Sequence, residues 1–165
     1  MVLGISSFTY GWELMRSDSK SMNEQDLIAR TVDFGLNCLQ IGDNLPLHTL
    51  SSTRLTDLHK TIRQNNIRLE LGARGLTEDN LQRYVDIAVL LQAPLLRFVI
   101  DENKYEPDIE TIISILKNIL GVLNKHAITL GIENHDRFRA KELSHMLEAI
   151  SDDHVGICLD SVNPI

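Results

Sequence analysis

The chain has 165 residues, a formal net charge of −7 and a hydrophobic content of 43%. This length suits a single domain with one hydrophobic core. The acidic balance and the lack of a Lys/Arg cluster argue against nucleic acid as a partner, because binding its backbone requires cations that neutralise phosphates. No apolar run approaches the roughly 20 residues of a membrane-spanning helix, and the first residues lack the pattern of a signal peptide. We therefore expect a cytoplasmic protein that binds neither nucleic acid nor membrane.

Apolar segments of strand length recur along the whole chain, with helical patterns between them. Continuous apolar runs are typical of strands that are buried on both faces, as in a parallel sheet with helical crossovers. The order is strand then helix, five times, followed by a sixth strand. The six expected strands lie at residues 2–6, 37–41, 67–71, 95–100, 128–133 and 155–160.

Helix boundaries are marked by capping and turn residues. The run Ser21-Met22-Asn23-Glu24 has the spacing of a capping box, and Gly35 stands where a glycine commonly ends a helix. Thr77 precedes Glu78 and Asp79 in an expected first turn, and Pro107 suits the first turn of the next helix. These signals predict five helices that connect the strands.

A doubly wound sheet and a (β/α) barrel both fit this order of elements. The segment after the first strand, Ser6-Ser7-Phe8-Thr9-Tyr10-Gly11-Trp12, contains neither a Gly-x-Gly-x-x-Gly nor a Walker pattern, which weakens the nucleotide-binding alternative. The sequence therefore favours an α/β fold with a parallel barrel sheet. In such a barrel the chemistry lies where strands end and loops begin.

Glu133 ends the apolar run Gly131-Ile132-Glu133, and Asp160 ends the run Gly156-Ile157-Cys158-Leu159-Asp160. A carboxylate at this depth needs a cation or strong hydrogen-bond donors close by. A divalent metal meets that need. The alternative is that each acid caps a helix or pairs with an arginine such as Arg97 or Arg137.

Five longer stretches of the sequence are informative: Gly4 to Trp12, Asp43 to His48, Leu69 to Gly75, Ile132 to Phe138 and Gly156 to Pro164. Together they resemble a known family, the xylose-isomerase-like sugar phosphate isomerase/epimerase superfamily. The last two of these stretches are the most specific. The resemblance implies a parallel (β/α) TIM barrel over residues 1–165, as a single domain that is truncated after strand 6, with about six strands and five helices of the eightfold barrel.

In that family the glutamate ending strand 5 and the aspartate ending strand 6 ligate a divalent metal, roles that map onto Glu133 and Asp160. The implied reaction is proton transfer beside a carbonyl of a sugar or sugar phosphate, through a metal-stabilised enediolate, with Glu133 as catalytic acid/base. The family completes its site with a histidine from strand 7 and a glutamate from strand 8. Because this sequence has neither, we expect Mn, Mg, Co or Zn to bind weakly.

Further residues are expected to contact a small carbohydrate substrate, each with a structural alternative. His135 follows Glu133 by two positions but also suits a loop in which backbone groups satisfy its ring. Glu70 and Arg97 are expected either to form a buried ion pair or to bind substrate. The aromatic loop after the first strand suits either a sugar pocket or ordinary packing. The complete set is His135, Glu70, Arg97, Tyr10, Trp12, His48 and Asn163.

Two other functional readings stay open. The chain could be an inactive barrel fragment without a complete metal site, or the scaffold could serve a metal-dependent lyase such as a dehydratase. An endonuclease IV type of phosphodiesterase is disfavoured by the acidic charge. Asn163 and Arg139 stand where epimerases of the group often have histidine and glutamate, which leaves the substrate open. An unfinished barrel would also expose sheet edges, through which a homo-oligomer could form.

Overall fold

The computed structural model describes residues 2–17, 21–135 and 137–163, in which one six-stranded parallel sheet has the order β1-β2-β3-β4-β5-β6. Each strand pairs with its neighbour in sequence, whereas a doubly wound sheet reverses its order at a switch point. The α/β prediction of an incomplete TIM barrel is therefore confirmed. The strands are β1 (Gly4–Ser6), β2 (Cys38–Ile41), β3 (Arg68–Arg74), β4 (Leu95–Val99), β5 (Thr129–Glu133) and β6 (Val155–Cys158).

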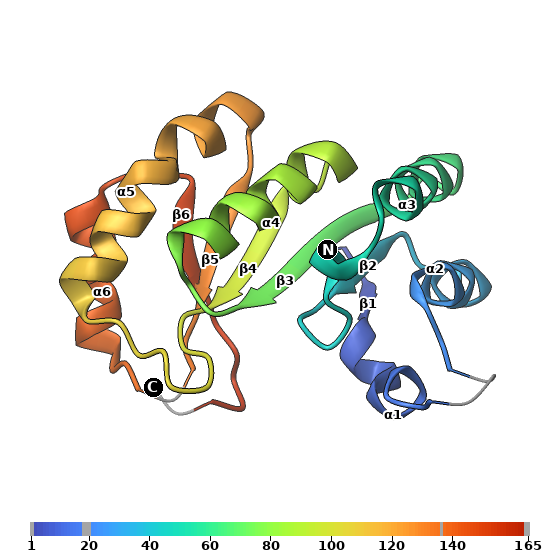
Figure 1. Ribbon diagram of the computed structural model, residues 1–165, viewed down its shortest axis with the longest axis horizontal. Coiled ribbons are helices and arrows are strands. Elements are labelled where there is room, and N and C mark those ends of the chain that lie inside the picture. The colour runs from blue at the N-terminus through green and yellow to red at the C-terminus, as the bar shows by residue number, and fades with distance from the viewer. Residues whose placement is uncertain (1, 18–20, 136, 164–165) are drawn as a thin grey trace.

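Five helices connect these strands and follow one another around the outside of the curved sheet (Figure 1). They are α2 (Glu24–Asp33), α3 (Ser52–Gln64), α4 (Glu78–Leu91), α5 (Ile109–His126) and α6 (Ala140–Ile150). The loops after β1 and β2 contain short helices that the periodicity does not reveal. These are the 3-10 helices η1 (Ser7–Tyr10) and η2 (Leu47–Thr49) and the one-turn helix α1 (Gly11–Leu14).

The helix boundaries agree with the sequence at some ends and correct it at others. Thr77 caps α4 through the Asn80 amide, and Gly35 follows the C-cap of α2 with φ +66, as predicted. The capping box of α2 is wrong by two residues, because Asn23 and Asp26 form it. Pro107 precedes the first turn of α5, since Asp108 is the N-cap and accepts from the amide of Thr111.

Side chains alternate between the two faces of the sheet, and the faces differ in character. The outer face packs against the helices through fully buried residues such as Leu39, Leu71, Leu96, Phe98 and Leu130. The register pairs Gln40 with Glu70 and Gly72 with Arg97, so these residues lie on the opposite, inner face. The inner face therefore presents polar side chains, and the loops after the strands extend this polar surface.

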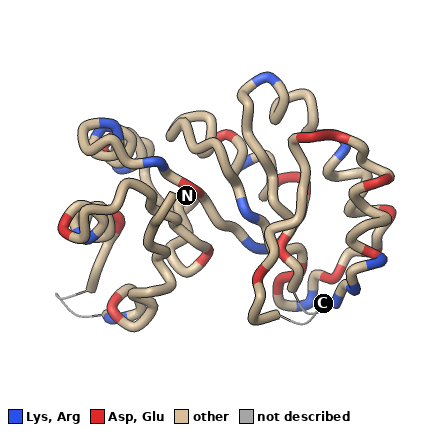
Figure 2. Tube along the Cα trace, turned by 180° about the vertical axis from the view of Figure 1, so that it is seen from behind, with Lys and Arg blue, Asp and Glu red and all other residues tan. Residues whose placement is uncertain are grey.

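The surface carries both signs of charge. Lys and Arg are interspersed with Asp and Glu along the trace (Figure 2). None of the helices in the described part of the chain combines the length and apolar character that a bilayer crossing requires.

Candidate active site at the carboxyl ends of the strands

Four charged side chains meet where β2, β3, β4 and β5 end, and we call them the mouth cluster: Asp43, Arg74, Arg97 and Glu133. Arg97 Nη1 donates to Glu133 Oε2, and Arg97 Nη2 donates to Asp43 Oδ1 at 3.1 Å. Arg74 Nε donates to the other oxygen of Asp43, Oδ2, at 3.1 Å. The cluster is thus a continuous chain of alternating charges, Arg74 to Asp43 to Arg97 to Glu133.

Strand register explains how Arg97 reaches two acids from different strands. Arg97 lies opposite Gly72 in the β3–β4 ladder. A Cβ at position 72 would lie 3.0 Å from Arg97 Nη2 and 3.2 Å from Nε, so the glycine leaves room for the guanidinium. The centroid of the Phe8 ring lies 5.7 Å from the guanidinium carbon, close enough for a cation–π contact.

Burial makes the Arg97–Glu133 pair energetically important. The side chains of Glu133 and Arg97 are only 5% and 12% exposed. Removing one partner from such a pair leaves an uncompensated buried charge, which is costly. Arg97 also carries a buried Nε donor that finds no acceptor among the described residues. The guanidinium therefore pairs with two acids, while its buried Nε–H has no acceptor among the described residues.

Asp160 is held beside the end of β5 by its backbone. The buried side chain of Asn134 accepts from the Asp160 amide at 2.6 Å and donates to the Asp160 carbonyl at 3.1 Å. The amide of Asn163 donates to the same carbonyl at 3.3 Å, and its side-chain nitrogen lies 3.4 Å from Glu133 Oε1. Asn134 and Asn163 thus link the two predicted metal ligands.

The residues around Glu133 fit a divalent metal in donor type but not in number. Carboxylate oxygens suit Mg²⁺ and Mn²⁺. Within the described residues, however, no group of three or more His, Cys, Asp or Glu side chains is placed to hold a metal ion. Both oxygens of Glu133 have protein partners, Arg97 and Asn163, and Asp160 Oδ1 accepts from the Val162 amide at 2.9 Å. Metal binding by Glu133 and Asp160 therefore stays a prediction.

Two predicted substrate residues, His135 and Glu70, differ in their position relative to the mouth cluster. The backbone amide of His135 donates to the Glu133 carbonyl at 2.9 Å, which places this residue at the same strand end. The expected Glu70–Arg97 ion pair is wrong, because Glu70 pairs with Arg68 at 3.2 Å. The register explains the difference, since Glu70 lies opposite Leu95 and Arg97 is two residues closer to the strand ends.

The aromatic loop after β1 divides between packing and solvent. Tyr10 is half-buried against the core, whereas Trp12 is 86% exposed. Phe8 is the aromatic residue of this loop that approaches Arg97. A sugar pocket walled by Tyr10 and Trp12 therefore has no support from the described contacts.

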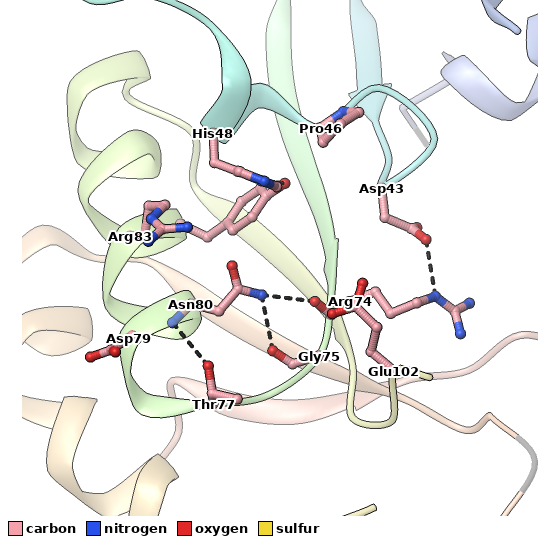
Figure 3. A pocket seen from close by; sticks show the side chains of 11 residues that line it. Asp43, Pro46, His48, Arg74, Gly75, Thr77, Asp79, Asn80, Arg83 and Glu102 are labelled. Carbon is pink, nitrogen blue, oxygen red and sulfur yellow. Dashed lines mark hydrogen bonds and ion pairs between the residues drawn. The ribbon is translucent and has the colours of Figure 1, made fainter. Parts of the chain in front are cut away.

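A pocket of about 470 Å³ lies between the loop after β2 and the first turns of α4 (Figure 3). His48 Nδ1 lies 3.0 Å from the hydroxyl of Tyr84, and burial, reinforced by Asp43 and Glu102, raises the pKa of Tyr84 to about 12. Asn80 donates to the carbonyls of Arg74 and Gly75, which fixes the wall of the pocket. His48 therefore lies in a pocket that the mouth cluster borders through Asp43 and Arg74.

Asp43 and Asn134 are central to the site, and the sequence did not single them out. Asp43 follows an apolar strand and Gly42, so the rule that selected Glu133 also applies to it. Asn134 gave no comparable signal, since its role depends on the packing of two neighbouring loops.

Comparisons with known proteins show the family of this chain. The Xylose isomerase-like TIM barrel family matches residues 28–165. The chain therefore belongs to this family. The 3-oxo-isoapionate decarboxylase of Pectobacterium atrosepticum is 26% identical over 163 residues, which cover 99% of this chain and 59% of that relative.

Solved structures show the same fold. A D-psicose 3-epimerase, crystallised in the presence of D-fructose, superposes with a TM-score of 0.75 at 15% identity, over 97% of this chain and 63% of that one. A xylose isomerase-like TIM barrel protein from Mycobacterium smegmatis, in complex with magnesium, gives a TM-score of 0.72 at 13% identity, over 97% of this chain and 63% of the other. The chain thus spans about three fifths of the length of these relatives.

Proposed function

We propose that this chain provides the strand-5 and strand-6 part of a sugar isomerase or epimerase site, in which Glu133 transfers a proton at the carbon beside a carbonyl. The observation that carries the proposal is the position of Glu133. It is a buried carboxylate at a strand end, and a guanidinium is its direct partner. Catalytic groups of barrel enzymes are found at this end of the sheet.

Residues of the chain supply three requirements of such a reaction. Glu133 accepts the proton and returns it. Arg97 and Asn163 contact its two oxygens and fix its orientation. Asp160, held by Asn134, is the expected second metal ligand. A divalent cation bound by Glu133 and Asp160 would stabilise the negative charge that develops on the substrate oxygens.

The match to a decarboxylase supports a second candidate function on the same residues. Loss of carbon dioxide from a 3-oxo sugar acid breaks a carbon–carbon bond and leaves its electron pair as an enediolate, which a protonated Glu133 would then protonate. The likeness to the decarboxylase extends over nearly the whole chain. Both candidates therefore have Glu133 deliver a proton to the carbon beside the carbonyl, and the isomerase or epimerase reaction also requires it to remove one first.

The test is exchange of carbon-bound hydrogen with solvent, which detects proton transfer without requiring complete turnover. The chain is incubated with Mg²⁺ and D-fructose, D-psicose or L-ribulose in D₂O, and proton NMR follows the hydrogen beside the carbonyl. We expect this signal to decrease with the native chain and to persist with Glu133→Gln. Glu110→Gln, an exposed carboxylate in the first turn of α5, is the matched control.

Exchange at the native rate in Glu133→Gln would reject Glu133 as the acid/base. The absence of exchange above the buffer rate for every ketose would reject the isomerase or epimerase proposal for this chain. Release of carbon dioxide from a 3-oxo sugar acid, dependent on Glu133, would then favour the decarboxylase alternative.

A further inference from the structure

We propose that the pocket of about 470 Å³ beside η2 is a second binding site, which takes a neutral sugar and lies next to the mouth cluster. Its volume is within the range of roughly 300–1,000 Å³ that small-molecule sites span. Binding there requires neither a metal nor proton transfer by Glu133, so the inference goes beyond the proposed function. It is supported by the charges, the free hydrogen-bond acceptors and the rings that line the pocket.

The charges that line the pocket balance one another. Asp43 pairs with Arg74 at 3.1 Å. Arg83 and Glu102 lie on opposite sides of the pocket (Figure 3), and neither has an ion-pair partner in the described part of the chain. The remaining carboxylate, Asp79, is exposed and directed away from the other lining side chains. A charged ligand would therefore meet its own sign of charge as well as the opposite one, whereas the hydroxyls of a neutral ligand can donate to the carboxylates and accept from the guanidiniums.

Asn80 supplies an acceptor whose orientation is fixed. Its side-chain nitrogen donates to the carbonyls of Arg74 and Gly75 at 2.8 and 2.9 Å, and its backbone amide donates to Thr77 Oγ1 at 3.2 Å. Because both side-chain partners are carbonyls, the nitrogen must face them and Oδ1 must face the pocket. Figure 3 shows this oxygen directed toward His48, and no donor that the structure describes reaches it. A ligand hydroxyl gains this hydrogen bond with little further loss of side-chain freedom.

Glu102 presents a second free acceptor on the opposite wall. A Cβ at Gly75 would lie 2.5 Å from Glu102 Oε2, and Gly75 has a φ of +80, so a glycine suits this close approach. The backbone amides of Glu102 and Tyr105 donate to each other's carbonyls at 3.2 and 2.8 Å, which closes the loop that carries the carboxylate. The two carboxylate oxygens can therefore accept from neighbouring hydroxyls, and adjacent carbons of a sugar ring provide such a pair.

Rings complete the lining of the pocket. Tyr84 is 3% exposed, and its hydroxyl lies 3.0 Å from His48 Nδ1. The two rings pack edge to face with centroids 5.5 Å apart, and Pro46 also lines the pocket. When Tyr84 donates to Nδ1, the other ring nitrogen of His48 carries its hydrogen and becomes a donor. Small-molecule sites commonly combine apolar surface with a few fixed polar groups, and a sugar offers C–H groups to the first and hydroxyls to the second.

Amide NMR of the isotopically labelled chain tests the inference with methyl glycosides, which have no free carbonyl and do not react. The neutral probes are methyl β-D-glucopyranoside, methyl β-D-xylopyranoside and methyl α-D-mannopyranoside, each without metal. We expect at least one to bind with a dissociation constant below about 10 mM. The amide signals of Gly75, Asn80 and Glu102 should shift, and those of Glu133 and Asn134 should stay in place.

Charged counterparts test the class of ligand. Methyl β-D-glucosaminide carries an ammonium group and methyl β-D-glucuronide carries a carboxylate, on the same ring as the neutral glucoside. We expect each to bind more weakly than the tightest neutral probe, by at least about threefold, because the pocket presents both signs of charge.

Substitutions at exposed positions test the site without disturbing the core. We expect Glu102→Gln and Arg83→Gln each to weaken binding of the neutral glycoside at least about threefold, because hydrogen bonds to charged groups are stronger than those to amides. Glu106→Gln is the matched control for the first, since Glu106 is exposed in the same loop but does not line the pocket. Arg63→Gln, in the last turn of α3, is the control for the second. Both controls should bind as the native chain does.

No binding of any neutral glycoside, native affinity in either Glu102→Gln or Arg83→Gln, or shifts confined to the amides around Glu133 would overturn the inference. Tighter binding of the glucosaminide or the glucuronide would overturn the assignment to neutral sugars. Pocket shifts without hydrogen exchange on ketoses would contradict only the proposed function. Hydrogen exchange without pocket shifts would contradict only this inference.

Discussion

Arg97 on β4 donates a hydrogen bond to the carboxylate of Glu133 on β5, and both side chains are largely buried. The same guanidinium binds Asp43 after β2. One cation on β4 therefore joins a residue at the end of β5 to one that follows β2, and it is the direct charged partner of the proposed catalytic glutamate. Because Arg97 and a bound metal would both contact Glu133, a change at Arg97 should alter both the free energy of unfolding and the affinity for metal.

Breaking this pair should destabilise the chain more than removing both partners. Arg97→Gln leaves Glu133 buried without its cation, and we expect a loss of about 3 kcal/mol in the free energy of unfolding. The double variant Arg97→Gln/Glu133→Gln should be more stable than the sum of the single changes implies. Urea denaturation of all four proteins measures the coupling. Strictly additive effects would show that the two side chains do not interact energetically.

Asn134 should control the order of the loop that carries Asp160. Asn134→Ala removes one acceptor and one donor for the Asp160 backbone, so we expect a loss of about 1–3 kcal/mol and faster hydrogen exchange at the Asp160 amide. Asn163→Ala, which changes a less buried amide on the same loop, should have the smaller effect. Unchanged protection of the Asp160 amide in Asn134→Ala would show that other contacts hold this loop.

The buried hydroxyl of Tyr84 should make stability fall at high pH. Burial raises the pKa of Tyr84 to about 12 in the folded chain, above the value of about 10 for an unfolded tyrosine. The unfolded state therefore loses this proton first, and the contribution present below pH 10 should decline by about 2–3 kcal/mol as the pH approaches 12. Denaturant titrations should show this decline, after subtraction of the Tyr84→Phe curve. An identical pH dependence in the two proteins would reject it.

The edges of the sheet should promote self-association of the 165-residue chain. Within the described strands, β1 pairs only with β2 and β6 only with β5. Leu159 and Val162, which follow β6, are 63% and 89% exposed. We expect sedimentation to show association that rises with concentration and that Leu159→Lys reduces. Leu90→Lys, on the outer surface of α4, is the control, and a monomer at every concentration would contradict the expectation.

The order of the elements could be predicted from the sequence because periodicity and capping are local signals. The run at 128–133 and the cap at Thr77 both agree with the structure to within a residue. The capping box of α2 was misplaced because Ser21-to-Glu24 and Asn23-to-Asp26 both have suitable spacing, and sequence alone does not distinguish them.

The partners within the site depend on strand register, which local patterns do not encode. Glu70 and Arg97 share the inner face, so an ion pair was reasonable from periodicity alone. The ladder instead places Arg97 opposite Gly72, within reach of Asp43 and Glu133. Arg97 lies two residues farther along the sheet than the position opposite Glu70, and this offset decides which acids the arginine binds.

We expect Glu133 and Asp160 to form the metal-binding part of this site, and Mn²⁺ titration followed by electron paramagnetic resonance checks this claim. We expect weak binding of one ion by the native chain and an affinity at least about tenfold lower in both Glu133→Gln and Asp160→Asn. Asp153→Asn, an exposed carboxylate just before β6, should bind as the native chain does. Native Mn²⁺ affinity in both Glu133→Gln and Asp160→Asn would contradict the claim.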